Sequence, residues 1–557
     1  MKRTHYCCLT TLAALTLLTA GCREDPVTPR SDRIGEANEY FSKAEWYPGG
    51  ELGTTTNEEG CYGNPAPAVE LQGLDDAFNN GELFFERDMT LDTEPFAGLG
   101  PLWQRPGCLY CHPNYGKGSR QRTFNPNTRG NSYKLHIYHP AGSVGRDGNR
   151  YEEDTFVDEV TMNPKTAAMD PFKPEVDPAQ IRIAWHSATD EHGNRFPDGE
   201  TYDLIYPQVD IPLSAFNVDP KPDNYEVRIY SSVGIYGNGL LGAIPEDSLK
   251  AQWQKEAQFA ELNPRMWDKS RNTWAETAYL PTAGGGRAVA RFNYAMDNLF
   301  VADALSTLNM TDADHHYFDS TDAWARAMSE SPEVNQRVRS GSSPLLRPYL
   351  GNGTEEDVRK MVEEVLGLNT PEDAADFETF FGQGEASSER SDLEYYQLAV
   401  WLRGIPVPMA RNLDKPEVQR GKELFYDMEC IRCHRPSWNT GKDPYPLNSA
   451  LAAAGLDLPH YPNQTIWPYT DMVQHRLFMK NDLMTGWCRT AHLWGRGLML
   501  QETGHADRLH DNRARTVIEA IMWHGFDTRS DAYPQAQLFY NLPKEDRDAV
   551  VAFIEAI

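Results

Sequence analysis

Two short cysteine and histidine motifs constrain this chain more than any other feature of its sequence. Each has the form Cys-x-x-Cys-His, and the residues are Cys108, Cys111 and His112 in the first motif and Cys430, Cys433 and His434 in the second. Two thiols one helical turn apart can add to the two vinyl groups of one haem, and the histidine that follows can bind the iron. The sequence therefore predicts two covalently attached haem c groups.

Structural zinc is the main alternative for a Cys-x-x-Cys pair. A closed zinc site takes four protein ligands, so it would need a second pair close to the first. Here the two motifs lie far apart along the chain, and a redox dithiol would not require the histidine. The pattern favours haem, with His112 and His434 as the proximal iron ligands.

The first segment of the chain is typical of an export signal. Lys2 and Arg3 precede an apolar run over residues 7–18, and small residues follow it. This order of charge, apolar run and small residues predicts a signal peptide over residues 1–21. No later stretch has the roughly 18 uncharged residues that a membrane-spanning helix needs. We expect an exported protein that faces the periplasm or the cell surface.

The residues around Cys22 predict a lipid anchor. Leu-Thr-Ala-Gly-Cys at 18–22 resembles a bacterial lipoprotein cleavage site, in which the cysteine is diacylated, although Thr19 replaces the usual aliphatic residue. Lipidated Cys22 would give peripheral membrane association. An ordinary secretory signal with an incidental cysteine is the alternative. Residues 22–70 are acidic and have little periodic hydrophobicity, so we expect them to form a tether.

The charge of the chain limits its partners. It contains 81 acidic and 53 basic residues, and its formal net charge is −28. Such a field repels phosphate backbones and argues against nucleic acid as a partner. We expect a redox partner protein or a small oxidant instead; the sequence does not predict an oligomeric state.

Two helices that pack together are predicted around the second motif. Val418, Gly421 and Phe425 recur at helical spacing over residues 416–426, with a glycine where another helix could cross closely. A second apolar face follows Pro543 and contains Val550, Phe553, Ile554 and Ile557. Before the first motif, Glu82-Leu83-Phe84-Phe85 resembles Glu423-Leu424-Phe425-Tyr426.

Between the motifs the pattern changes twice. Residues 180–187, 201–211 and 225–232 are rich in Ile, Val, Tyr and Thr, which predicts a few strands. Residues 312–411 show helical periodicity. The predicted fold is mainly α with irregular loops: an N-terminal haem domain with a small strand-containing insertion (71–311), a helical connecting region (312–411) and a C-terminal cytochrome c-like haem domain (412–557).

These residues resemble the bacterial di-haem oxidoreductases described as putative peroxidases, which are relatives of the di-haem cytochrome c peroxidases. The resemblance covers about residues 70–557. It depends on the segments 98–102, 196–202, 237–245, 468–471, 493–495 and 509–516. Asn512 stands where such proteins usually have glycine. The resemblance implies a di-haem enzyme of peroxidase type.

The distal ligand of the second haem is predicted on a helix near the C-terminus. Val517, Ala520, Ile521 and His524 share one helix face, Thr516 and Glu519 have the form of a capping box, and Gly525 follows. In the related peroxidases the matching helix carries a distal methionine, which implies that His524 binds the iron held at Cys430 and Cys433. A buried histidine without a metal is the alternative; the weaker candidates are Met522, His475, Met479 and Met484.

For the first haem the related peroxidases place a removable histidine shortly after the motif. His136 and His139 lie on a predicted strand, where an odd separation puts them on opposite faces. We favour His139 over His136, a surface or core histidine without a metal is the alternative, and no catalytic acid or base is predicted. Arg508, Arg513 and Arg515 could bind haem propionates or form an ordinary surface cluster.

Three functions are consistent with these sequence features. The first is a peroxidase-like enzyme in which the C-terminal haem relays electrons to an N-terminal haem that reduces peroxide or another small oxidant. The second is an electron-transfer cytochrome with both irons six-coordinate. The third is thiol oxidation, although Cys61 and Cys488 form no Cys-x-x-Cys pair and could equally form a disulfide or remain free. Trp401 and Trp494 could shorten an electron path, or fill cores.

Overall fold

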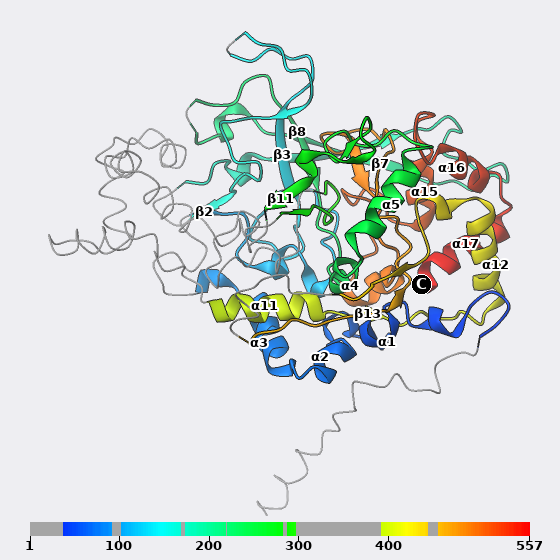
Figure 1. Ribbon diagram of the computed structural model, residues 1–557. Coiled ribbons are helices and arrows are strands. Elements are labelled where there is room, and N and C mark those ends of the chain that lie inside the picture. The colour runs from blue at the N-terminus through cyan, green and yellow to red at the C-terminus, as the bar shows by residue number, and fades with distance from the viewer. Residues whose placement is uncertain are drawn as a thin grey trace, which may run out of the picture.

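The structure is a computed structural model (Figure 1). It describes residues 37–91, 102–146, 148–168, 173–218, 220–281, 287–296, 392–443 and 455–557. The signal segment, Cys22, most of the segment 98–102 and residues 312–391 of the predicted helical region lie outside these ranges. None of the described helices is long and apolar enough to cross a membrane.

Two crossed helix pairs organise the molecule, at the lower left and the right of Figure 1. The first pair is α3 (Asp75–Glu86) with α11 (Asp392–Gly404), and the second is α12 (Pro416–Asp427) with α17 (Lys544–Ala556). The predicted helices after Pro416 and Pro543, and their packing together, are confirmed. In each pair the partner helix comes from a distant part of the sequence.

Both pairs cross at a glycine. A Cβ on Gly81 would lie 2.0 Å from the carbonyl oxygen of Gln397, and a Cβ on Gly421 would lie 2.0 Å from that of Ala549. A further contact is also equivalent, because each Cβ would lie 2.7 Å from a partner Cβ, that of Trp401 or of Phe553. Only glycine permits so close an approach of two helix backbones.

The buried positions of the two helices follow the same order. They are Phe78, Gly81, Phe84 and Phe85 in α3, and Val418, Gly421, Leu424 and Phe425 in α12. The resemblance between residues 82–85 and 423–426 pairs Phe84 with Phe425, whereas in the structure Phe85 is the equivalent of Phe425. Sequence identity suggests the pairing of Phe84 with Phe425, whereas the glycine crossing pairs Gly81 with Gly421 and so Phe85 with Phe425.

The boundary of the predicted helical region also changes. Residues 392–404 form α11, which packs on α3 and so belongs with the first motif rather than with a connecting region. We call α3, α11 and the first motif the N-terminal module, and α12, α17 and the second motif the C-terminal module. The sequence could not reveal this pairing because a long insertion separates α3 from α11.

The predicted strands are confirmed, but the sheets are small and numerous. β6 (Arg182–Ala188) pairs with β7 (Leu204–Asp210), and β3 (Lys134–His139) pairs with β8 (Glu226–Tyr230) and β4 (Thr155–Phe156). The shorter strands are β1 (Thr54–Thr55), β2 (Leu102–Trp103), β5 (Ala167–Ala168), β9 (Trp267–Asp268), β10 (Thr273–Trp274), β11 (Tyr279–Pro281), β12 (Arg287–Val289), β13 (Val407–Pro408), β14 (Trp438–Asn439), β15 (Thr465–Ile466), β16 (Gln474–Arg476) and β17 (Trp487–Arg489). The fold is therefore mixed rather than mainly α.

The remaining helices are short. They are α1 (Gly50–Gly53), α2 (Pro67–Leu71), α4 (Asn238–Gly242), α5 (Glu246–Glu256), α14 (Met499–Thr503), α15 (Val517–His524) and α16 (Tyr533–Tyr540). One apolar core surrounds α3 and α11, a second lies among α12, α15 and α17, and a third lies under β3, β6 and β8.

The described part of the predicted tether is folded. Phe41, Trp46 and Tyr62 are buried, and the Glu45 carboxylate lies 2.6 Å from the ammonium of Lys422 on α12. The prediction of a free spacer over residues 22–70 is therefore wrong from residue 37 onward. A few large aromatic side chains anchor this acidic segment without any periodic pattern.

Candidate functional site

A cavity of about 530 Å³ opens beside the second motif. Cys430, Cys433 and His434 line one part of it, and His524 from α15 lines another. Its wall includes apolar side chains from α12, α15, α16 and α17, and residues of β16 and β17 also line it. The sequence-predicted ligands of the second haem therefore share one cavity.

Three histidines are held in the same manner. Nδ1 of His112 lies 3.1 Å from the carbonyl oxygen of Gly116, Nδ1 of His434 lies 3.0 Å from that of Tyr469, and Nδ1 of His524 lies 2.7 Å from that of Ala520. A carbonyl can only accept, so each Nδ1 carries the proton and Nε2 keeps its lone pair. This is the arrangement that a metal-binding histidine needs.

Burial keeps these imidazoles neutral. It lowers the pKa of His112 and of His434 to about 4, although the carbonyl bonds oppose the shift. Burial also lowers the pKa of His524. At neutral pH all three rings can therefore act as ligands without losing a proton first.

The local sequence explains the position of His524. Thr516 caps α15, because its hydroxyl oxygen accepts the backbone N–H of Glu519 at 3.1 Å. The Glu519 carboxylate accepts the backbone N–H of Arg515 instead of that of Thr516, so only half of the predicted capping box forms. His524 then ends the helix, and Gly525 allows α16 to pack closely because a Cβ there would lie 2.6 Å from the Cβ of Ala536.

The rival ligands are distributed differently. His475 and Met479 line the same cavity as His524. Met484 lines a separate groove, and Met522 is buried on α15 but does not line the cavity. Of these side chains only His524 combines a cavity-lining position with an Nδ1 bound to a carbonyl.

Two arginines supply unpaired donors to this cavity. Nη2 of Arg496 and Nε of Arg508 are buried without a hydrogen-bond partner, and both residues line the cavity. Carboxylates such as haem propionates are natural partners for these groups. A cavity lined by apolar side chains, by His434 and His524 and by orphaned guanidinium N–H groups fits a haem.

Of the arginines proposed from the sequence, only Arg508 is placed for this role. Arg513 is held by Asp511 at 2.7 Å, and Arg515 by Glu519 at 2.6 Å and Asp203 at 2.8 Å. Arg496 was not predicted, although it directly follows the Leu-Trp-Gly segment at 493–495 that carries part of the family resemblance.

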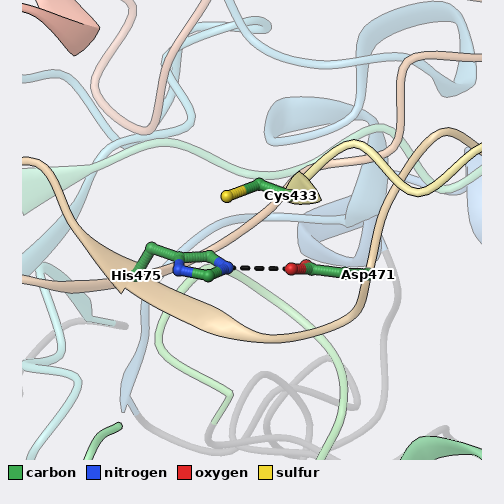
Figure 2. A group of neighbouring side chains, drawn as sticks. All are labelled: Cys433, Asp471 and His475. Carbon is green, nitrogen blue, oxygen red and sulfur yellow. Dashed lines mark hydrogen bonds and ion pairs between the residues drawn. The ribbon is translucent and has the colours of Figure 1, made fainter. Parts of the chain in front are cut away.

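Cys433, Asp471 and His475 form a compact group at the edge of the cavity (Figure 2). Their ligand atoms all lie within 4.8 Å of one another, and His475 Nε2 is 2.8 Å from the Asp471 carboxylate. Burial alone would lower the pKa of His475, but Cys433, Asp471 and Asp531 raise it well above the usual value. Such a donor set could hold a divalent metal only while the Cys433 sulfur is free, and a thioether bond to haem at Cys433 would exclude the metal.

The first motif is fixed from two sides. Phe85 of α3 lies against His112 with ring centroids 6.3 Å apart, as Phe425 of α12 lies against His434 at 6.2 Å. On the other side the Ser232 hydroxyl donates to the carbonyl of Cys111 at 2.7 Å. Ser232 follows β8, so the end of this strand is hydrogen-bonded to the motif.

The two candidate distal histidines of the first haem face different surroundings. Lys134 and His136 alternate along β3 with Leu135 and Ile137, which belong to the apolar core beneath the sheet. Burial and then the Lys134 ammonium together lower the pKa of His136 to about 3, and Lys134 also lowers the pKa of His112. The side of β3 that carries Lys134 and His136 therefore faces the first motif.

The His139 ring contacts residues other than the first motif. Its ring stacks on Tyr151 with centroids 4.3 Å apart, and its Nδ1 lies 3.4 Å from the carbonyl of Asn224. Both ring nitrogens of His136, in contrast, are buried without a partner. The preference for His139 is thus reversed in favour of His136, because strand alternation places His139 on the other face.

Several further residues have structural roles. Cys61 and Cys488 are both free thiols, so of the two alternatives for this pair the disulfide does not form. Trp401 and Trp494 are fully buried in the first core. Asn512 has φ +66, so the left-handed turn is retained there without glycine.

Comparison with known proteins connects the C-terminal geometry to a family. Residues 378–557 match the family model described as "Di-haem oxidoreductase, putative peroxidase". Neither the curated proteins nor the solved structures gave a match. The matched segment contains the second motif, the glycine crossing of α12 and α17, and His524. Over residues 378–557 this chain is therefore similar to the di-haem oxidoreductases of the putative peroxidase family.

Proposed function

We propose that the chain is an exported, lipid-anchored oxidoreductase with two covalently attached haem c groups in two cytochrome c-like modules. The C-terminal haem relays electrons, and peroxide or another small oxidant is reduced at the N-terminal haem. The observation that carries this proposal is that each cysteine pair is followed by a buried, neutral histidine whose Nδ1 is bound to a backbone carbonyl.

The C-terminal site is suited to electron transfer. His434 and His524 would hold the iron from two sides, which leaves no open position for a substrate. Both rings are fixed by their carbonyl bonds, so neither is free to swing away. Arg496 and Arg508 would bind the propionates of this haem. When bound, the two haems supply one-electron transfer and the reducing equivalents for the oxidant.

The N-terminal site is suited to reaction. His136 is buried on the side of β3 that faces the motif, and no hydrogen bond restrains either ring nitrogen. An unrestrained, neutral imidazole can move away from an iron or accept a proton from peroxide. We assign His136 this role at the N-terminal haem.

One observation also favours the second function, a pure electron-transfer cytochrome. The same His136, if it stays on the iron, would make the N-terminal haem six-coordinate. Thiol oxidation gains no support, because the two thiols lie apart: Cys61 lies in the core around α3 and α11, whereas Cys488 lines the cavity beside the second motif.

Spectroscopy and ligand binding test the proposal. Resonance Raman and EPR of the purified holoprotein should show one low-spin haem with two histidines and a second haem that binds CO when reduced. The protein should also consume H₂O₂. Two low-spin haems, no CO binding and no peroxide consumption would replace the enzyme with the electron carrier.

The anchor has its own test. Metabolic labelling with a fatty acid should mark the wild type, and Cys22→Ser should remove the label and release the protein from membranes while both haems stay attached. An unlabelled wild type that fractionates as a free protein would mean an ordinary secretory signal.

A further inference from the structure

A buried aromatic cluster lies between the two candidate haem sites. Tyr230 at the end of β8, Tyr294 and Leu483 form this cluster, and the two tyrosines are each 2% exposed. Tyr230 belongs to the strand that supports the first motif, whereas Tyr294 belongs to the wall of the second cavity. The cluster therefore connects the two modules.

Tyr294 forms one end of this connection. It lines the cavity that also contains Cys433, His434 and His524. Its ring stands edge-on to His510, which lines the same cavity, with centroids 6.3 Å apart. The Tyr294 ring would thus lie in the wall of the cavity that holds the C-terminal haem.

Tyr230 forms the other end. Its ring lies against His136 with centroids 4.6 Å apart, and it is the cross-strand partner of Lys134. Two residues further along, Ser232 donates its hydroxyl proton to the carbonyl of Cys111. Tyr230 therefore contacts the candidate distal histidine of the N-terminal site, and its strand is connected to the motif through the Ser232 hydrogen bond.

Lys117 fixes Tyr294 in this position. Its ammonium is buried, donates to the Tyr294 hydroxyl at 3.3 Å and also donates to the carbonyl of Leu509. Lys117 follows His112 by one short loop, so the segment after the first motif holds a tyrosine in the wall of the second motif's cavity. Among the described residues no carboxylate forms an ion pair with Lys117, and the phenol oxygen takes that place. Burial would raise the pKa of Tyr294, yet Lys117 and Arg496 lower it overall.

We propose that Tyr294 and Tyr230 form the path by which single electrons pass from the C-terminal to the N-terminal haem. The inference rests on the proposed function and adds the residues that join its two halves. Each transfer oxidises one haem by one electron and reduces the other by one; no bond forms or breaks and no proton moves. The rings act as the connecting medium, so the aromatic ring matters and the hydroxyl does not carry the electron.

The test measures electron transfer between the haems directly. In holoprotein with both haems attached, rapid mixing with a limiting amount of reductant is followed by the absorbance of each haem. Tyr294→Leu and Tyr230→Leu should each slow the transfer by about tenfold or more. Tyr294→Phe and Tyr230→Phe should stay close to the wild-type rate. Methionine is the second replacement at each position if the leucine variant yields no holoprotein, since it fills space without a ring.

Controls separate the ways in which the proposal can fail. Tyr202→Leu removes a buried tyrosine of the second core and should not change the rate. Resonance Raman should show the wild-type ligand set in every variant. A wild type without transfer between its haems would overturn the proposed function itself. If the wild type shows transfer and the leucine variants transfer at the same rate, only the tyrosine path is overturned. The same conclusion follows if the phenylalanine variants are as slow as the leucine variants, or if the Tyr202→Leu control is as slow as they are.

Discussion

The two modules share a proximal side and differ on the distal side. In both, a helix crosses its partner at a glycine, a phenylalanine four residues later lies against the motif histidine, and that histidine is bound through Nδ1 to a carbonyl. On the distal side, His524 ends a capped helix and is fixed by a hydrogen bond, whereas His136 lies on a strand with no hydrogen bond to its ring. In the proposed function, one scaffold would therefore support two chemistries, because the restraint on the distal histidine differs between the modules.

The largest expected effect is loss of one haem at a time. Cys430→Ser with Cys433→Ser should remove the C-terminal haem, and Cys108→Ser with Cys111→Ser should remove the N-terminal haem, because a hydroxyl does not form the thioether. Absorbance of the pyridine haemochrome measures the change, and each double variant should retain half of the wild-type haem. Cys488→Ser is the control and should retain both; full haem content in either double variant would break the comparison.

The distal histidines should affect different haems. His524→Ala should convert the C-terminal haem from low spin to high spin, because the iron loses its restrained ligand. The spin state of the N-terminal haem should stay unchanged. His136→Ala should change only the N-terminal haem. EPR of the ferric protein resolves the two. An unchanged low-spin signal from the C-terminal haem in His524→Ala would remove His524 from the iron.

The glycine crossings should be equally intolerant of a methyl group. Gly81→Ala and Gly421→Ala each place a Cβ where a carbonyl oxygen already lies, so each should cost about 1–3 kcal/mol of unfolding free energy, as overpacking usually does. Urea unfolding measures this cost. Asn79→Ala and Glu417→Ala, at exposed positions of the same helices, should stay within about 0.5 kcal/mol. If only one glycine proves sensitive, the two crossings are not equivalent.

The smallest expected effect concerns acid stability of the C-terminal module. The buried Arg547 guanidinium on α17 lies 2.6 Å from Asp198 and 2.7 Å from Glu200, and these contacts hold the pKa of both carboxyls below their usual values of 3.8 and 4.5. Since the folded-state pKa values are lowered, the stabilisation is present above pH 4.5 and is lost as the pH falls further.

Thermal unfolding between about pH 7 and pH 3 measures this dependence. Arg547→Met should be less stable at neutral pH and lose less stability than the wild type on acidification. Lys544→Met removes the more exposed cation beside Glu200 and should have a weaker effect. Parallel pH profiles of Arg547→Met and wild type would show that this ion pair does not matter.

Local patterns in the sequence predicted much of the C-terminal module. The helices at Pro416 and after Pro543, the Thr516 cap and the inward face of His524 depend on spacing within a dozen residues, and all of them are present. The three longest predicted strands of the insertion are present for the same reason.

The pairings between distant segments could not be predicted in this way. The contact of α11 with α3, the packing of residues 37–70 and the exposure of Arg496 to the cavity depend on segments that are far apart in sequence. His136 and His139 show the limit most clearly, because the sequence established that they face opposite ways but not which face meets the motif.

The mass of the denatured holoprotein most directly tests whether each module holds one haem through two thioether bonds. After expression with a c-type maturation system, unfolding and removal of everything not covalently bound, we expect the mass of the processed polypeptide plus two haems. A polypeptide that carries no haem under these conditions would contradict this central claim.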